Sequence, residues 1–251
     1  MSETRKAAAS SGIRFRLGGK DWTIPWAVVS AAMVGAALGI VMSRRQADQD
    51  DLRSLLPFSP MAICFYFWIV LSVYWSLEAR KASAVKSSES RSSRALHVTL
   101  TTGAQLLAFW FYPGWPRLAS PPFVFPRVLP AWPFLAPLGV AVQAGGLLLA
   151  LWARRSLGRH WSGEVTVKED HELVRSGPYR RIRHPIYTGA IAMYIGPALV
   201  SGRLQGVLSL ALVAIAYARK IRQEERVLSA EFGSAYDDYC RESWVVFPGL
   251  I

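Results

Sequence analysis

The sequence predicts an all-α protein, a polytopic integral membrane helical bundle with five to six spans. Three observations support this: the composition, the charge-free apolar runs, and the positions of the basic residues. Hydrophobic residues make up 52% of the 251 residues and charged residues only 18%. A soluble domain with so few charges would have difficulty covering its own surface.

Four runs contain no Lys, Arg, Asp or Glu, and each is long enough to cross a hydrocarbon core of about 30 Å as a helix. Two shorter apolar runs follow, separated by the turn residues Ser201, Gly202 and Arg203, and we expect them to form a short helical hairpin. The second arm is marginal for a full span at about 1.5 Å rise per residue. The four long runs are 22–43, 54–77, 95–116 and 128–153, and the two short ones are 185–202 and 204–218.

The net charge of +12 is distributed as a membrane topology would require. With six spans and the N-terminus inside, 23 of the 29 basic residues fall in the four inside segments and the other 6 in the three outside loops. This positive-inside pattern predicts that both termini are cytoplasmic. The basic residues can also contact anionic membrane lipid, whereas they lack the interleaved aromatic residues of a nucleic-acid groove, so we expect no nucleic-acid partner.

The chain changes character near residue 153. We expect residues 1–21 to be a flexible cytoplasmic tail, residues 22–152 to hold four transmembrane helices, and residues 153–251 to form a separate module. That module contains a long polar loop with apolar residues spaced through it, which favours a structured and functional loop. It ends in an amphipathic segment, 219–239, that predicts a cytoplasmic helix continuing or following the hairpin, with Gly233 ending or kinking it.

The densest polar pattern runs from Ser176 to Gly189. Pro185 is well placed for the first turn of a helix, where its missing N–H costs nothing. His184 then stands at the helix entrance, where free backbone N–H groups attract an anionic ligand group. A basic loop leading into an ordinary helix is the structural alternative.

Two adjacent carboxylates, Glu224 and Glu225, follow the hairpin. They are either solvated side chains on a helix surface or partners for a cation, which can belong to the protein or to a ligand. Arginines are abundant around them, so simple ion pairing is a serious alternative.

Taken together, these motifs closely resemble the isoprenylcysteine carboxyl methyltransferase family, which is related to the membrane phospholipid N-methyltransferases. The resemblance covers about residues 150–250. It implies a small site outside the Rossmann class, built from membrane helices and a cytoplasmic loop, that binds S-adenosylmethionine, opens sideways to lipid and needs no metal. The matching segments are Gly158 to Gly163, Val165 to Lys168, His171 to Val174, Tyr179, His184 to Gly189, Glu224-Glu225, Phe232 to Tyr239, and Phe247 to Gly249.

The resemblance also implies roles for particular residues. Arg222, with Lys220 as the other choice, is expected to orient a substrate carboxylate, and Glu225 to act beside it. Many relatives place a basic residue before the final proline, whereas this chain reads Ser243 to Phe247 there, so a substrate contact from that tail is in doubt. The expected cofactor contacts are Lys168, His171, Glu172, Leu173, Val174, Tyr179, His184, Pro185, Ile186, Tyr187 and Glu225.

The predicted function is methyl transfer to a lipophilic or small-molecule carboxylate. Such an acceptor, with a pKa of about 4, is ionised at neutral pH and needs orientation rather than a general base. A phospholipid amine is the alternative acceptor, and it would have to lose a proton, with His160 or Glu164 as candidate helpers. A non-catalytic membrane carrier or sensor that retains the pocket is the other alternative. The four histidines do not group with Cys or Glu into a metal-ligand set, so no metal site is expected.

Overall fold

The protein is described by a computed structural model in which helices dominate. It describes residues 12–17, 20–25, 59–79, 90–109, 125–158 and 173–249. In chain order, the elements are β1 (Gly12–Leu17), β2 (Lys20–Pro25), α3 (Pro60–Ala79), α4 (Arg91–Ala108), α5 (Leu135–Leu157), η5 (Gly177–Arg180), α6 (Pro185–Ser201), α7 (Leu204–Phe232) and α8 (Ser234–Glu242).

The first two elements correct the sequence prediction. β1 and β2 pair as an antiparallel hairpin, with Leu17 opposite Lys20 and Gly12 opposite Pro25. The described residues are mostly helical, as predicted, but part of the expected tail and the start of the first predicted span are extended backbone. Apolar and charged residues alternate along β1, a period typical of strands, and Gly18-Gly19 is the kind of dipeptide that joins a two-residue hairpin.

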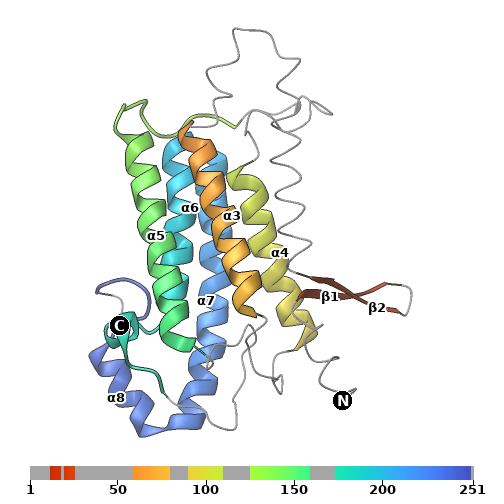
Figure 1. Cartoon of the computed structure of the whole chain (residues 1–251), viewed down its shortest axis with the longest axis vertical. Helices are drawn as coiled ribbons and strands as arrows, with labels where there is room; N and C mark the ends of the chain where they lie inside the picture. Colours follow the sequence, from red (N-terminus) through yellow and green to blue (C-terminus); the bar gives the residue numbers. More distant parts are fainter. Residues whose placement is uncertain are drawn as a thin grey trace.

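Long apolar helices confirm the membrane character of the chain. Three are long and apolar enough to cross a bilayer, Pro60–Glu78, Leu135–Leu157 and Leu204–Phe232, and α6 is a shorter apolar helix. The run 22–43 lies outside the described residues, apart from 22–25 in β2, so the number of spans stays a prediction. Figure 1 shows α3 to α7 side by side as a bundle, with α8 beyond one end of it.

The closest helix contact is between α5 and α6, and glycines make it possible. A methyl group added at Gly146 would lie 2.6 Å from the carbonyl oxygen of Gly189, and one added at Gly139 would lie 2.6 Å from that of Gly196. Such distances leave no room for any side chain, so the two backbones touch directly. Small residues allow this approach between helices in a membrane.

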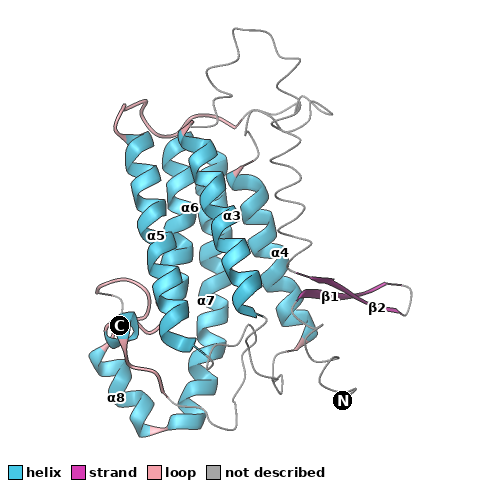
Figure 2. Ribbon diagram, in the orientation of Figure 1, coloured by secondary structure: helices cyan, strands magenta, loops and turns pink. Residues whose placement is uncertain are grey.

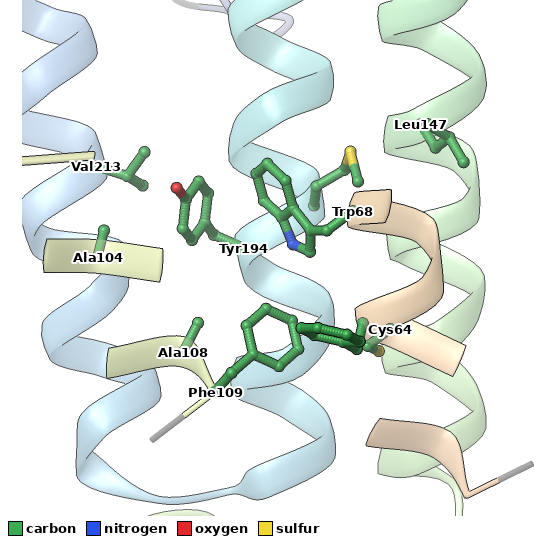
Figure 3. Packing of buried hydrophobic residues seen from close by; sticks show 10 residues of the cluster. Cys64, Trp68, Ala104, Ala108, Phe109, Leu147, Tyr194 and Val213 are labelled. Atoms are coloured by element: carbon green, nitrogen blue, oxygen red, sulfur yellow. The ribbon is translucent and has the colours of Figure 1, made fainter. Parts of the chain in front are cut away.

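The apolar core lies where five helices meet (Figure 3). Trp68 of α3 packs edge-on against Tyr194 of α6, with ring centroids 4.8 Å apart. The side-chain amide of Gln143, fully buried on α5, donates to the carbonyl of Cys64 at 2.7 Å. This hydrogen bond connects α3 to α5, and it pairs the amide nitrogen where an unpaired donor would be costly. The other labelled residues are Ala104, Ala108, Phe109, Leu147 and Val213.

Helix α7 is longer than the predicted second arm of a short hairpin. It runs without interruption for 29 residues, or about 43 Å at 1.5 Å per residue, which exceeds the hydrocarbon thickness. It carries Glu224 and Glu225 in its last third. Gly233, at φ +51°, ends it, because a positive φ is readily available only to glycine, and α8 then turns back toward the start of α6 (Figure 2).

Candidate active site

The candidate site lies at the end of the bundle where α6 begins. Pro185 is the first residue of α6, as the sequence predicts, and His184 is the N-cap residue. The last third of α7, the short helix α8 and the segment after α8 surround this entrance (Figure 1). The loop 125–134 lies at the opposite end of the bundle.

The polar loop residue and the acidic pair meet at this entrance. His184 Nδ1 lies 3.5 Å from Glu224 Oε2, and Nε2 lies 3.4 Å from Glu225 Oε1. The histidine side chain is only 5% exposed, whereas the two carboxylates are about a quarter exposed. Segments about 40 residues apart in the chain are thus in direct contact. The two glutamates are partners for cations of the protein rather than merely solvated side chains, which agrees with the ion-pairing alternative.

The pair of carboxylates favours a charged histidine. Burial lowers the pKa of His184, while contacts with Glu224 and Glu225 raise it by more, so the net pKa lies above that of an ordinary histidine. A raised pKa extends the pH range over which the imidazolium form persists. The Nε2 contact with Glu225 at 3.4 Å is an ion-pair contact that lacks the alignment of a full hydrogen bond among the described residues.

An aromatic stack supports the same end of the site. The ring of Tyr187 lies 5.7 Å from that of His184 at an interplanar angle of 14°, and 4.8 Å from that of Tyr217 at 22°. The Tyr187 hydroxyl donates to Glu224. Tyr217 in turn contacts His97 of α4 at 5.7 Å. The stack holds the Tyr187 ring of α6 against Tyr217 of α7. The Tyr187 hydroxyl is thereby placed to orient the Glu224 carboxylate.

Arg183 is a central residue of the site that the sequence interpretation did not single out. Its Nε donates to Glu225 Oε1 at 3.1 Å, and its Nη1 donates to the carbonyls of Cys240 at 3.0 Å and Ser243 at 2.5 Å. The side chain is 5% exposed. Its neighbours Arg180 and Arg181 are exposed, so a basic run alone gives no sign of which arginine turns inward.

The segment after α8 pairs with the loop before α6. The backbone N–H of Arg183 donates to Trp244 at 2.8 Å and that of His184 donates to Val245 at 3.1 Å. Thr188 Oγ1, on the first turn of α6, donates to the carbonyl of Val246 at 2.6 Å. These bonds make the tail a wall of the site, contacting it through backbone rather than through a basic side chain.

Tyr179 lies in the short η5 helix and is buried beneath the loop. Its carbonyl accepts a 2.5 Å hydrogen bond from the hydroxyl of Tyr239 on α8. Burial, together with the charge of Glu224, holds the pKa of Tyr179 well above its usual value, and burial raises the pKa of Tyr239 to about 12. Both phenols therefore stay protonated at neutral pH, and that of Tyr239 acts as a hydrogen-bond donor.

An open groove of about 590 Å³ runs between α7 and α8 beside this cluster. Glu225 lines it from the bundle side, with Arg222 and Arg226 projecting from the same helix. The groove thus offers carboxylate and guanidinium groups within one cavity, a combination suited to ligands that carry both signs of charge. The remaining lining residues are Ser229, Ala230, Tyr236, Asp237 and Cys240.

The structure brings together only part of the predicted residue set. His184 contacts Glu225 directly, and Tyr187 is connected to them through the neighbouring Glu224. Tyr179 lies beneath the loop that carries His184, and Arg222 is an exposed residue of the groove. Pro185 is fully buried in the first turn of α6, which gives it a structural task. Three further predicted cofactor contacts are half-buried, namely Leu173, Val174 and Ile186. Lys168, His171 and Glu172 lie outside the described residues, as do His160 and Glu164.

The metal-ligating residue types do not assemble. Across residues 59–79, 90–109, 125–158 and 173–249, no three His, Cys, Asp or Glu side chains are placed to hold one ion.

Comparison with known proteins gives a consistent picture for this part of the chain. The phospholipid methyltransferase family model matches residues 135–235. A protein-S-isoprenylcysteine O-methyltransferase of Schizosaccharomyces pombe is 32% identical over 102 residues, 38% of this chain and 43% of the relative. A cobalt-zinc-cadmium resistance protein of Cupriavidus metallidurans is 32% identical over 119 residues, 47% of this chain and 52% of the relative. The chain spans about half the length of the curated relatives it matches.

A solved structure shares the fold over a longer region. The eukaryotic intramembrane Ras methyltransferase, an isoprenylcysteine carboxyl methyltransferase, superposes with a TM-score of 0.53 over 90% of this chain and 77% of its own, at 19% identity. At that identity the likeness concerns the fold, whereas the family model covers the residues of α6 and α7 that form the site. Residues 135–235 of this chain are thus similar to the phospholipid methyltransferase family model, and the fold is similar to that of an isoprenylcysteine carboxyl methyltransferase.

Proposed function

We propose that this protein is an integral membrane methyltransferase that transfers the methyl group of S-adenosylmethionine to the carboxylate of a lipophilic or small molecule. The observation that carries the proposal is the contact between His184 and Glu225. It joins the loop before α6 to the acidic pair of α7 within the part of the chain that the family match covers.

The residues present fit this cofactor. S-adenosylmethionine supplies an activated sulfonium methyl group together with an ammonium and a carboxylate. Glu224 and Glu225 can face a cation, Arg222 and Arg226 can face a carboxylate, and His184 Nε2 is a buried donor with no aligned acceptor among the described residues. Lys168, His171 and Glu172 remain predicted contacts from the sequence.

Methylation of a carboxylate requires that the acceptor be held in the right orientation, and it does not require a base that removes a proton. The carboxylate oxygen provides the electron pair for the new C–O bond, while the pair of the broken S–C bond stays on sulfur, so no proton has to move. Arg222 lines the same groove as Glu225 and can hold the acceptor carboxylate in line with the methyl group. Alignment of this kind supplies much of the rate acceleration in transfer reactions, and a fixed guanidinium provides it through two parallel hydrogen bonds.

The direct test uses the purified protein in detergent. Titration calorimetry with S-adenosylmethionine and with its demethylated product is expected to show saturable binding, and His184→Ala and Glu225→Ala are expected to abolish it. Gly145→Ala, at an exposed helix position with nothing within 4 Å of the added carbon, is the matched control that keeps binding. Wild-type protein that gives no saturable heat with either ligand would refute the assignment.

The bond formed can be read from its chemistry. Methyl-labelled cofactor is incubated with the protein and either a prenylated cysteine or a lipid extract. A carboxyl methyl ester releases labelled methanol in alkali, whereas an N-methyl group does not. We expect alkali-labile label.

The alternative is N-methylation of a phospholipid amine, and one observation favours it: the matching family model is described as phospholipid methyltransferase. Alkali-stable label in the lipid fraction would select it. Label in neither fraction, with binding intact, would favour the third reading, a carrier or sensor that retains the pocket.

We further infer that this site and both termini face the cytoplasm, and that residues 153–251 act as the methyltransferase module. The support is the positive-inside pattern and the exposed arginines, among them Arg180, Arg181, Arg222 and Arg226, at the site end of the bundle. Cysteines introduced singly at residue 181 and residue 128, at opposite ends, test the orientation by labelling from either side of sealed vesicles.

A further inference from the structure

Arg183 is a buried cation at the site end of the bundle, with a side chain that is only 5% exposed. Its guanidinium spans three separate parts of the chain: Glu225 on α7, the carbonyl of Cys240 near the end of α8, and the carbonyl of Ser243 beyond it. The hydroxyl of Ser243 lies 3.4 Å from the same Nη1 and also donates to the carbonyl of Tyr239. The cation is thus paired with one carboxylate and two backbone oxygens.

We propose that Arg183 is a positioning residue that holds the Glu225 carboxylate in its ligand-binding orientation and locks the segment 240–246 against the site. The proposal rests on the proposed function, since it assigns Glu225 a ligand. It adds a residue for which neither the family match nor the resemblance gives a role.

The geometry explains why an arginine serves here. A planar guanidinium directs Nε toward the carboxylate and Nη1 toward the carbonyls at the same time, whereas a lysine ammonium is a single point charge. The carbonyls lie at the C-terminal end of α8, where the helix dipole favours a cation. Removing one partner from a buried ion pair leaves the other uncompensated, so the coupling between the two residues should be large.

Glu225 has two cationic neighbours, and both contact the same oxygen. Arg183 Nε and His184 Nε2 both approach the same oxygen, Oε1, at 3.1 and 3.4 Å. The second oxygen, Oε2, is in neither contact. Glu225 is also part of the lining of the groove. The arrangement therefore fixes one oxygen through the protein and makes the other available to a ligand in the groove.

A double-mutant cycle on cofactor binding tests this coupling. Arg183→Gln and Glu225→Gln are made singly and together in the full chain, and the affinity for S-adenosylmethionine is measured by calorimetry. Arg183→Gln is expected to weaken binding about 10- to 100-fold. In the Glu225→Gln background, the same change is expected to alter the affinity by less than about 3-fold, because the residue it positions is already gone. Exposed Arg181→Gln is the matched control and should leave binding unchanged.

The pH profile of binding gives a readout that a merely structural role would not move. Without the guanidinium, the Glu225 carboxylate is protonated more easily, so the acid limb of the Arg183→Gln profile should shift to higher pH. Arg183→Lys restores the charge without the fork and should move the limb back while recovering only part of the affinity. If Arg183→Gln fails to fold, Arg183→Lys takes its place in the same measurements.

The outcomes separate the two claims. Wild-type protein that binds no cofactor removes the proposed function, and with it this role. Wild-type binding combined with additive effects of Arg183→Gln and Glu225→Gln, or with an unmoved acid limb, overturns the positioning role alone. Strong coupling with a shifted limb supports it.

Discussion

Helix α6 belongs to two very different environments. Along its length it packs on α5 through Gly189 and Gly196, whose positions would place an added methyl group within 2.7 Å of the α5 backbone. At its start it meets α7 and the tail. Arg183 and His184, directly before its first residue, lie 3.1 and 3.4 Å from the Glu225 carboxylate of α7. The contact with α5 leaves no space for an added atom, whereas the contacts at the start of α6 are made between charged side chains.

The difference separates what holds the helices from what is available to a ligand. Backbone contact between α5 and α6 tolerates no added atom, because neighbouring carbonyl groups cannot move aside cheaply. The site end depends on the signs of its side chains and has an adjacent open groove. Volume changes should therefore damage stability in the first region, and charge changes should damage binding in the second.

The largest expected loss of stability comes from the helix interface. The double change Gly146→Ala and Gly189→Ala should destabilise the protein by about 2–5 kcal/mol, since each new carbon would lie within 2.6 Å of a backbone oxygen and force the helices apart. Thermal unfolding in detergent measures it. Gly145→Ala should be neutral or slightly stabilising. Equal behaviour of the neighbouring residues 145 and 146 would show that the close packing is absent in solution.

A smaller effect is expected from Tyr187→Phe, which keeps the ring stack but removes the hydroxyl that donates to Glu224. A hydrogen bond to a charged group is worth about 1.5–3 kcal/mol, so cofactor affinity should fall about 10- to 100-fold. The unfolding temperature should change little. Tyr66→Phe, on an exposed part of α3, provides the control. A large loss of stability with unchanged affinity would place Tyr187 in the packing region instead.

The smallest expected effect is a pH dependence of stability at the site end. Because the folded-state pKa of His184 is raised by its carboxylate neighbours, its contribution is fully present below the unfolded pKa of about 6.5 and is lost as pH rises through the folded value. The unfolding midpoint should therefore decline across that window. His184→Asn should flatten this part of the curve, and a midpoint that rises with pH there would contradict the assignment.

Much of the bundle was predictable because its signals are local. Apolar runs located α3, α5 and α6, Pro185 marked the start of α6, and Gly233 marked the break before α8. The hairpin β1–β2 was missed because its short alternating pattern was read as part of a basic tail. The amphipathic pattern of 219–239 predicted a helix that continues or follows the hairpin, and α7 does continue through it as one helix as far as Phe232.

The site was predictable where motifs are contiguous and unpredictable where contacts are long-range. The sequence pointed to His184 and Glu225, and the structure places them in contact. Arg183 could not be separated from Arg180 and Arg181 by pattern, since only the three-dimensional arrangement shows which side chain turns inward. The contact of Gly146 with Gly189 likewise depends on which helices pair, and no single-helix pattern determines that.

The backbone pairing of the loop before α6 with residues 244–246 has a consequence for biosynthesis. Ser243, which accepts from Arg183, is made 60 residues later. At about 5–20 residues per second, several seconds pass between the synthesis of Arg183 and that of the residues whose carbonyls accept its hydrogen bonds. During that interval α6 can enter the bilayer while its charged entrance stays hydrated, and the pocket can close only after residues 240–246 have been synthesised.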